Sequence, residues 1–170
     1  MAEANLLVTF DPVHQESAKK EIESLMKETK QEGKIGKISP GLAQLTVKDA
    51  RKVIDALLKI AKKQIDKFTY TFNWWPVDKW CKAEVKEMQK VIAEMQKGIK
   101  KEEKWKMELA KRDTTKEYPK NIIIQLTEVV DKPNVDLEKP HKTIKVEIIG
   151  DKAAIALITE GEAINVPKLK

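Results

Sequence analysis

The chain has 170 residues and a formal net charge of +6 at neutral pH. This length excludes a large catalytic domain joined to a separate recognition module, and no apolar run approaches the roughly 18 residues of a membrane span, so we expect no membrane partner. The single cysteine, Cys81, excludes an internal disulfide and, with no basic start of a secretory signal, predicts a cytoplasmic protein.

Positive charge is concentrated before residue 121. Residues 73–120 carry 13 basic and 9 acidic side chains, whereas residues 121–170 carry 7 and 8. A basic excess of this kind favours a polyanionic partner such as RNA. A solvated, lysine-rich surface of a heat-tolerant protein explains the same charge, so composition alone leaves both interpretations open.

Hydrophobic periodicity predicts a βαββαβ unit in the first part of the chain. The expected elements are a strand at 6–10, a helix at 16–30, strands at 35–38 and 42–47, a helix after the N-cap Asp49, and a strand holding Phe68, Tyr70 and Phe72. This order is typical of a ferredoxin-like fold. The three aromatic side chains could stack on RNA bases, but core packing is favoured because no basic residue alternates with them.

A second α/β unit is predicted after the break at 73–78. Its expected elements are a helix with Val85, Met88, Ile92, Met95 and Ile99 on one side, a strand from Trp105 to Arg112, a helix beginning at Pro119, and a hairpin at 144–158 that turns at Gly150-Asp151. The segment Trp74–Trp80 joins the two units. Its indoles could clamp the domains or stack on nucleotides.

The residue inventory predicts no catalytic site, no metal site and no cofactor. His14 and His141 have no Cys or paired carboxylate at metal-ligand spacing, and no glycine-rich loop matches a phosphate-cradling motif. Cys81 lacks the local signature of a nucleophile. We therefore expect a binding protein and not an enzyme.

A candidate phosphate site lies where the second unit's first strand ends. Lys111 and Arg112 close that strand, and the free amides of a helix starting at Pro119 would lie beside them. Lys106 lies on the same strand face as Arg112. The alternative is that Lys111 and Arg112 simply pair with Asp113 and Glu117.

Four blocks in the second half resemble a known family. They are Lys104–Arg112, Leu126–Asp131, Asn134–Pro140 and Val146–Gly150, and in this order they resemble the THUMP domain of the tRNA-acetylation adaptor family. The resemblance is close over 104–158. It implies an α+β fold, with an N-terminal ferredoxin-like βαββαβ domain at 1–75 followed by an α/β THUMP domain at 76–170.

The resemblance also implies a function. The family's RNA contacts map to basic residues near the first THUMP strand and the helix after it, here Lys104, Lys106, Lys111, Arg112, Lys116 and Lys120. It implies a non-catalytic adaptor, monomeric alone, that presents the acceptor end of tRNA to an RNA cytidine acetyltransferase forming N4-acetylcytidine. His141 departs from the acidic residue that the family often has there. The alternatives are an adaptor for tRNA thiolation or methylation, or a small RNA-modifying enzyme.

Overall fold

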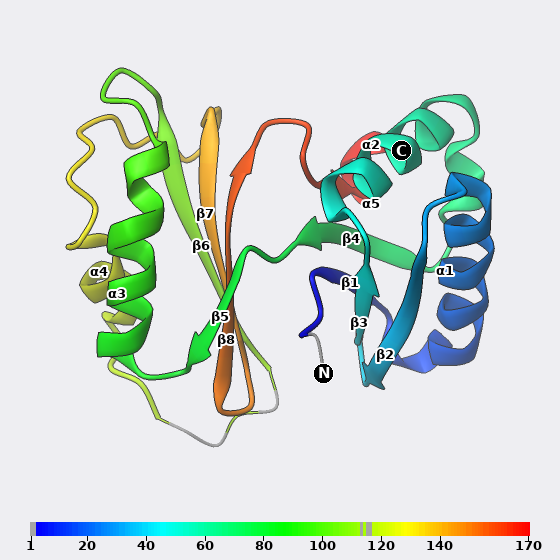
Figure 1. Cartoon of the computed structure of the whole chain (residues 1–170), viewed down its shortest axis with the longest axis horizontal. Helices are drawn as coiled ribbons and strands as arrows, with labels where there is room; N and C mark the ends of the chain where they lie inside the picture. Colours follow the sequence, from blue (N-terminus) through cyan, green and yellow to red (C-terminus); the bar gives the residue numbers. More distant parts are fainter. Residues whose placement is uncertain (1–2, 113, 115–116) are drawn as a thin grey trace. The chain divides into compact units, whose positions relative to one another are not determined.

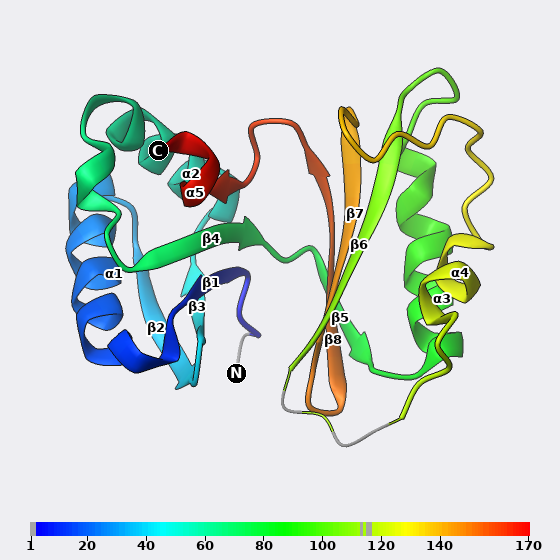
Figure 2. The ribbon, with the colours of Figure 1, turned by 180° about the vertical axis from the view of Figure 1, so that it is seen from behind.

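The computed structural model describes residues 3–112, 114 and 117–170, and the chain forms two compact units (Figure 1). The first unit runs up to Val77 and also contains Gly161–Lys170, and the second unit is Asp78–Glu160. Each unit is a β-sheet with helices packed on one face (Figures 1 and 2). The mixed α/β fold class predicted from the sequence is confirmed.

The first unit is ferredoxin-like, as predicted. Its elements are β1 (Leu6–Phe10), η1 (Pro12–His14), α1 (Gln15–Thr29), β2 (Gly33–Ser39), β3 (Leu42–Val47), α2 (Ala50–Lys63), η2 (Ile65–Lys67) and β4 (Thr71–Pro76), joined by β9 (Ile164–Asn165) and α5 (Val166–Leu169). The strand order is β2-β3-β1-β4-β9. Asp49 caps α2 as predicted, because its carboxylate accepts a hydrogen bond from the amide of Lys52 at 3.2 Å. Residues of α1 and α2 close a core against β1 and β3.

The strand that was predicted to hold Phe68, Tyr70 and Phe72 lies further along the chain, where it forms β4. Phe68 is buried in the core but precedes β4, and Phe72 is partly exposed. The segment Trp74-Trp75-Pro76, expected to be a linker, forms the end of β4, and Trp74 packs in the core. The reason is pairing at a distance, because β1 pairs antiparallel with β4 from Leu6 opposite Pro76 onward. An isolated alternation at 68–72 does not reveal that register.

The chain's last ten residues belong to the first unit, whereas the prediction placed them in the second. β9 adds to the sheet beside β4, with Asn165 opposite Asn73 and Ile164 opposite Trp74. Ile164 and Val166 then bury their side chains in the first core. Burial of two apolar side chains and a short ladder therefore hold a segment that is remote in sequence.

The carboxylate of Glu21 on α1 binds backbone amides at the start of β4. Its carboxylate accepts hydrogen bonds from the amides of Thr69 at 2.7 Å, Tyr70 at 3.0 Å and Thr71 at 2.8 Å. We expect Glu21→Ala to lower the free energy of unfolding of the first unit by about 2 kcal/mol, because three donors lose a charged acceptor. Urea titration would measure this, with the exposed Glu23→Ala on the same helix as control. Equal midpoints for the two variants would contradict the expectation.

The second unit is a four-stranded sheet with helices on one face. Its elements are β5 (Lys79–Lys82), α3 (Val85–Met95), η3 (Gln96–Gly98), β6 (Trp105–Arg112), α4 (Ile122–Thr127), β7 (Lys142–Ile149) and β8 (Lys152–Thr159). The strand order is β5-β8-β7-β6, with β6 parallel to β7 and the other pairs antiparallel. Met88 and Ile92 of α3 and Leu126 of α4 pack on the inward side chains of the sheet.

Two elements of this unit differ from the prediction. β5, which contains Trp80 and Cys81, was not predicted, because a four-residue strand is too short to show a period. α4 begins at Ile122 and not at Pro119, and it is only six residues long. Within the described residues, no helix is long and apolar enough to cross a membrane.

Candidate nucleic-acid interface

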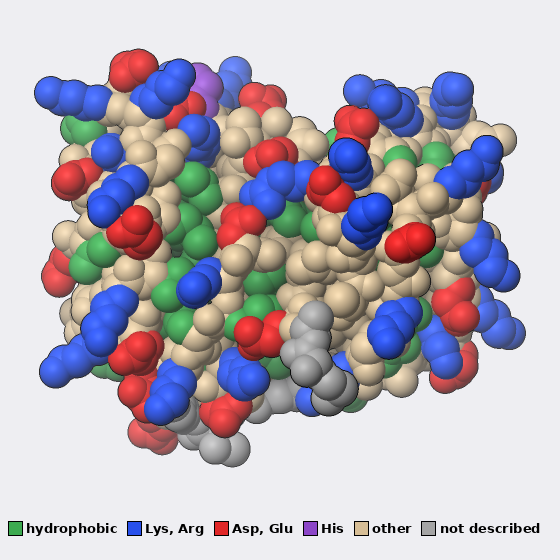
Figure 3. Space-filling view, viewed as in Figure 1, with side chains coloured by type: hydrophobic (Ala, Val, Ile, Leu, Met, Phe, Trp, Pro, Cys, Tyr) green, Lys and Arg blue, Asp and Glu red, His purple; other side chains and the backbone are tan. Residues whose placement is uncertain are grey.

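The basic residues predicted to bind RNA do not form one cluster. Lys104 precedes β6, whereas Lys111 and Arg112 end it. Seven residues of extended chain separate Lys104 from Lys111, which corresponds to about 23 Å. Over the second unit, basic and acidic side chains alternate (Figure 3). Lys104 and the pair Lys111–Arg112 therefore lie at opposite ends of one strand, within a surface of mixed charge.

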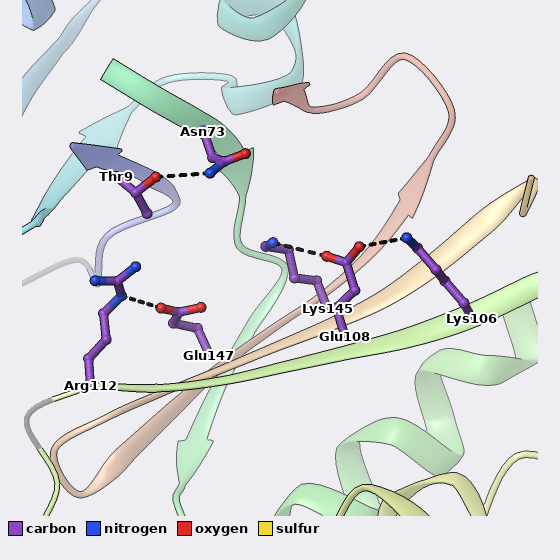
Figure 4. Close-up of polar contacts among 7 residues, drawn as sticks. All are labelled: Thr9, Asn73, Lys106, Glu108, Arg112, Lys145 and Glu147. Carbon is purple, nitrogen blue, oxygen red and sulfur yellow. Dashed lines mark hydrogen bonds and ion pairs between the residues drawn. The ribbon is translucent and has the colours of Figure 1, made fainter. Parts of the chain in front are cut away.

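The cations of β6 are also divided between two faces of the sheet. Lys106 and Arg112 lie on the face opposite α3 and α4, on the same side as predicted (Figure 4). Lys111 lies on the other face, and its ammonium sits 5.7 Å from the centre of the Tyr118 ring. A cation at this distance from an aromatic ring is attracted to the ring face.

Arg112 is engaged by a carboxylate that the sequence did not identify. Its Nε donates a hydrogen bond to Glu147 on the neighbouring strand β7, forming an ion pair (Figure 4). Glu147 is only 3% exposed, whereas the side chain of Arg112 is one-third exposed. A buried carboxylate needs a partner to remain charged. Arg112 therefore supplies the charge that Glu147 requires, and its role in the sheet is distinct from its predicted role toward RNA.

Lys106 belongs to a second cross-strand network. Glu108 accepts from Lys106 at 2.8 Å and from Lys145 of β7 at 3.1 Å (Figure 4). Partial burial raises the pKa of Glu108, but the hydrogen bond from Lys106 and the attraction of Lys145 outweigh it, so the pKa lies below its ordinary value of 4.5. One carboxylate thus holds two lysines on this face.

The depressed pKa of Glu108 predicts acid sensitivity of the second unit. A carboxyl whose folded pKa is lowered contributes stability that is present above its ordinary pKa of 4.5 and is lost as pH falls through the folded value. We therefore expect the urea midpoint to fall as pH is lowered below about 4.5, and Glu108→Gln to reduce that fall. The exposed Glu102→Gln is the matched control. An unchanged pH profile in Glu108→Gln would contradict the assignment.

The helix that was predicted to begin at Pro119 and to seat a phosphate begins instead at Ile122. α4 has no side-chain cap, and the amide of Ile122 donates to the carbonyl of Pro119 at 3.0 Å, so this amide is not free for an anion. Lys120 lies exposed in the turn before α4. Lys116 lies outside the described residues.

Lys104 is tied to a loop that the sequence left unexplained. Its amide donates to Nδ1 of His141 at 2.9 Å, its carbonyl accepts from the amide of His141 at 2.8 Å, and its ammonium pairs with Asp136 at 3.6 Å. The ammonium remains half-exposed, and an exposed ion pair of this kind contributes little to stability. Lys104 can therefore exchange this partner for another anion at little cost.

Cys81 is not poised for nucleophilic chemistry. Burial, and then the nearby Glu87, raise the pKa of its thiol to about 11, although Lys79 acts in the opposite direction. The thiol is therefore protonated at neutral pH, whereas a nucleophile requires the thiolate. In the described part of the chain, no three His, Cys, Asp or Glu side chains are placed to hold a metal ion.

Comparison with known proteins defines the fold class. No protein-family model and no curated protein matches this sequence. Solved structures, however, match nearly the whole chain at low identity, and the protein resembles THUMP-domain structures. This result agrees with the fold that the sequence blocks implied.

The particular structures that match come from several proteins. PH1313 from Pyrococcus horikoshii gives a TM-score of 0.69 at 15% identity, covering 95% of this chain and 55% of that one. A 4-thiouridine synthetase in complex with RNA and ATP gives 0.57 at 13% identity, with 96% and 42% covered. TrmN from Thermus thermophilus gives 0.55 at 12% identity, with 91% and 45% covered. The chain thus spans about half the length of the structures it matches, and what it shares with them is the fold.

Proposed function

We propose that this chain is a tRNA-binding module that serves an RNA-modification reaction. The observation that supports this most is the match of 96% of the chain to a 4-thiouridine synthetase solved in complex with RNA. The sequence blocks at 104–158, which resemble the THUMP domain of an adaptor family, add a second, independent argument. The net charge of +6 suits a polyanionic partner.

In the second unit, the best candidates for contacting RNA are the cationic side chains that can leave their present contacts. Lys104, Lys111 and Lys120 are exposed, and their contacts are an exposed ion pair for Lys104 and an aromatic ring for Lys111. Lys106 and Arg112, by contrast, neutralise Glu108 and Glu147 within the sheet. We therefore assign phosphate contacts to the first three residues and a supporting role to the other two.

The chain acts as a presenter of tRNA and not as a catalyst in this proposal. Its sequence lacks a glycine-rich loop for a nucleotide, and its thiol is held protonated. The resemblance favours an RNA cytidine acetyltransferase as the partner, with N4-acetylcytidine as the product. A presenter raises the rate by holding substrate and enzyme together, at an effective concentration of roughly millimolar.

Reconstitution tests this proposal. Purified chain with tRNA, acetyl-CoA and ATP should give no acetylcytidine by mass spectrometry, and adding the acetyltransferase should give acetylation that this chain stimulates. The stimulation should fade when tRNA saturates the acetyltransferase alone. Acetylation by the lone chain would overturn the presenter role, and an acetyltransferase indifferent to the chain would remove acetylation from the proposal.

A second candidate is an adaptor for thiolation or methylation of tRNA. The structural similarity to a 4-thiouridine synthetase favours thiolation within this class. Nucleoside profiling of tRNA from cells that lack the protein separates the candidates, because the modified nucleoside that disappears identifies the reaction served.

A further inference from the structure

A β-bulge in the first unit places two lysines on one face of the sheet. Lys34 of β2 lies opposite Thr46 of β3, and Lys37 lies opposite Gln44, with a register shift between Ile35 and Lys37. In a regular strand, residues three apart point to opposite faces. The unpaired residue between them, Gly36, changes this parity, so Lys34 and Lys37 share a face.

The shared face is the one without helices. Ile35 and Ile38 pack against the core that α1 and α2 cover, so the lysines between them point away from it. Thr46 and Gln44, their half-buried neighbours on β3, add a hydroxyl and an amide to the same face. This arrangement puts two ammonium groups beside two neutral hydrogen-bonding groups.

The two lysines are free to bind an anion. Both are exposed, and among the described residues neither side chain takes part in an ion pair or hydrogen bond. This contrasts with Lys106 and Arg112 of the second unit, which neutralise carboxylates. A phosphate that binds Lys34 and Lys37 would break no existing ion pair. The charge-assisted hydrogen bonds from the two lysines would therefore contribute in full to the affinity for RNA.

The spacing of the lysines suits a nucleic-acid backbone. Their partners Thr46 and Gln44 are two residues apart on β3, so the lysine backbones are about 7 Å apart along the strand. Flexible stems let the two ammonium groups hold one phosphate or two successive ones. Glu32, just before β2, is the nearby carboxylate in sequence and leaves the stretch from 32 to 37 with a net positive charge.

We propose that Lys34 and Lys37, with Thr46 and Gln44, form a phosphate-binding surface for RNA on the helix-free face of the first unit. This inference rests on the proposed tRNA-binding function and extends it from the second unit to the first. The bulge at Gly36 is the structural device that builds the surface, because it brings both lysines to one side.

Matched double variants test the surface. Lys34→Ala with Lys37→Ala should weaken tRNA binding roughly 10- to 100-fold, and it should reduce the log–log salt slope by about 2. Lys19→Ala with Lys20→Ala, on α1 of the same unit, removes the same charge from exposed positions and should change affinity less than about 3-fold. Lys34→Arg with Lys37→Arg should keep the binding of the unaltered chain.

The outcomes separate this inference from the function on which it rests. Equal losses from the two alanine pairs, with tRNA still bound by the unaltered chain, overturn the surface and leave the function standing. If the unaltered chain does not bind tRNA, both the surface and the proposed tRNA-binding function are overturned. Edge-strand lysines also protect sheets from edge-to-edge pairing, so size-exclusion chromatography accompanies each titration. If the variant Lys34→Ala with Lys37→Ala self-associates but binds tRNA with unchanged affinity, the two lysines serve to prevent edge-to-edge pairing, and the proposal is overturned.

Discussion

Replacing Arg112 by methionine is expected to destabilise the second unit by about 3 kcal/mol, because it leaves a buried carboxylate without its partner. Glu147 is 3% exposed and pairs with Arg112 across β6 and β7. Methionine keeps an apolar stem in the sheet and removes the guanidinium, with its charge and its hydrogen bond to Glu147. A shift of the urea midpoint at pH 7, followed by circular dichroism, would measure the loss.

A double variant provides the internal control. Glu147→Gln removes the buried charge, so Arg112→Met with Glu147→Gln should recover most of the stability that Arg112→Met loses. Lys120→Met, an exposed position before α4, should change stability by less than about 0.5 kcal/mol. A double variant as unstable as Arg112→Met would show that the pair does not couple. The RNA affinity of any Arg112 variant therefore has to be interpreted together with its folding.

Most elements could be predicted from the sequence because their signals are local. The alternation at Trp105, Met107 and Leu109 predicts β6, and the structure places Trp105 and Met107 in the core beneath the helices. The apolar stripe after Asp49 likewise predicts α2, and its cap is confirmed. Helical and extended periods are visible within a single segment, and no distant partner is needed to recognise them.

The errors at β4 and β9 concern features that depend on distant partners. β4 and β9 are strands because they pair with β1 and with each other, and neither partner is adjacent in sequence. The segment Trp74-Trp75-Pro76 has the composition of a break, yet its place beside β1 buries Trp74 in the core. Whether such a segment forms a strand depends on its pairing register with a partner strand and not on its composition.

The candidate site could be predicted only as a set of residue types. The sequence places Lys106 and Arg112 on one strand face, which is confirmed, but it does not show which carboxylates face them. Glu147 and Lys145 come from β7, at sequence separations of 35 and 37 from their partners Arg112 and Glu108. They meet because β6 and β7 are parallel and in a particular register. The bulge at Gly36 is hidden for the same reason, since only pairing with β3 reveals the extra residue.

Raising the salt concentration from 50 to 200 mM is expected to weaken tRNA binding roughly 60- to 1,000-fold, if four to six phosphates are neutralised and the log–log slope is about −3 to −5. The reason is counterion release, because exposed lysines such as Lys34, Lys37, Lys111 and Lys120 replace cations bound to the RNA. Fluorescence polarisation with labelled tRNA at several salt concentrations would measure the slope. Circular dichroism over the same range is the control, since the fold should not change. A slope near zero would contradict electrostatic recognition and, with it, the assignment of phosphate contacts in both units.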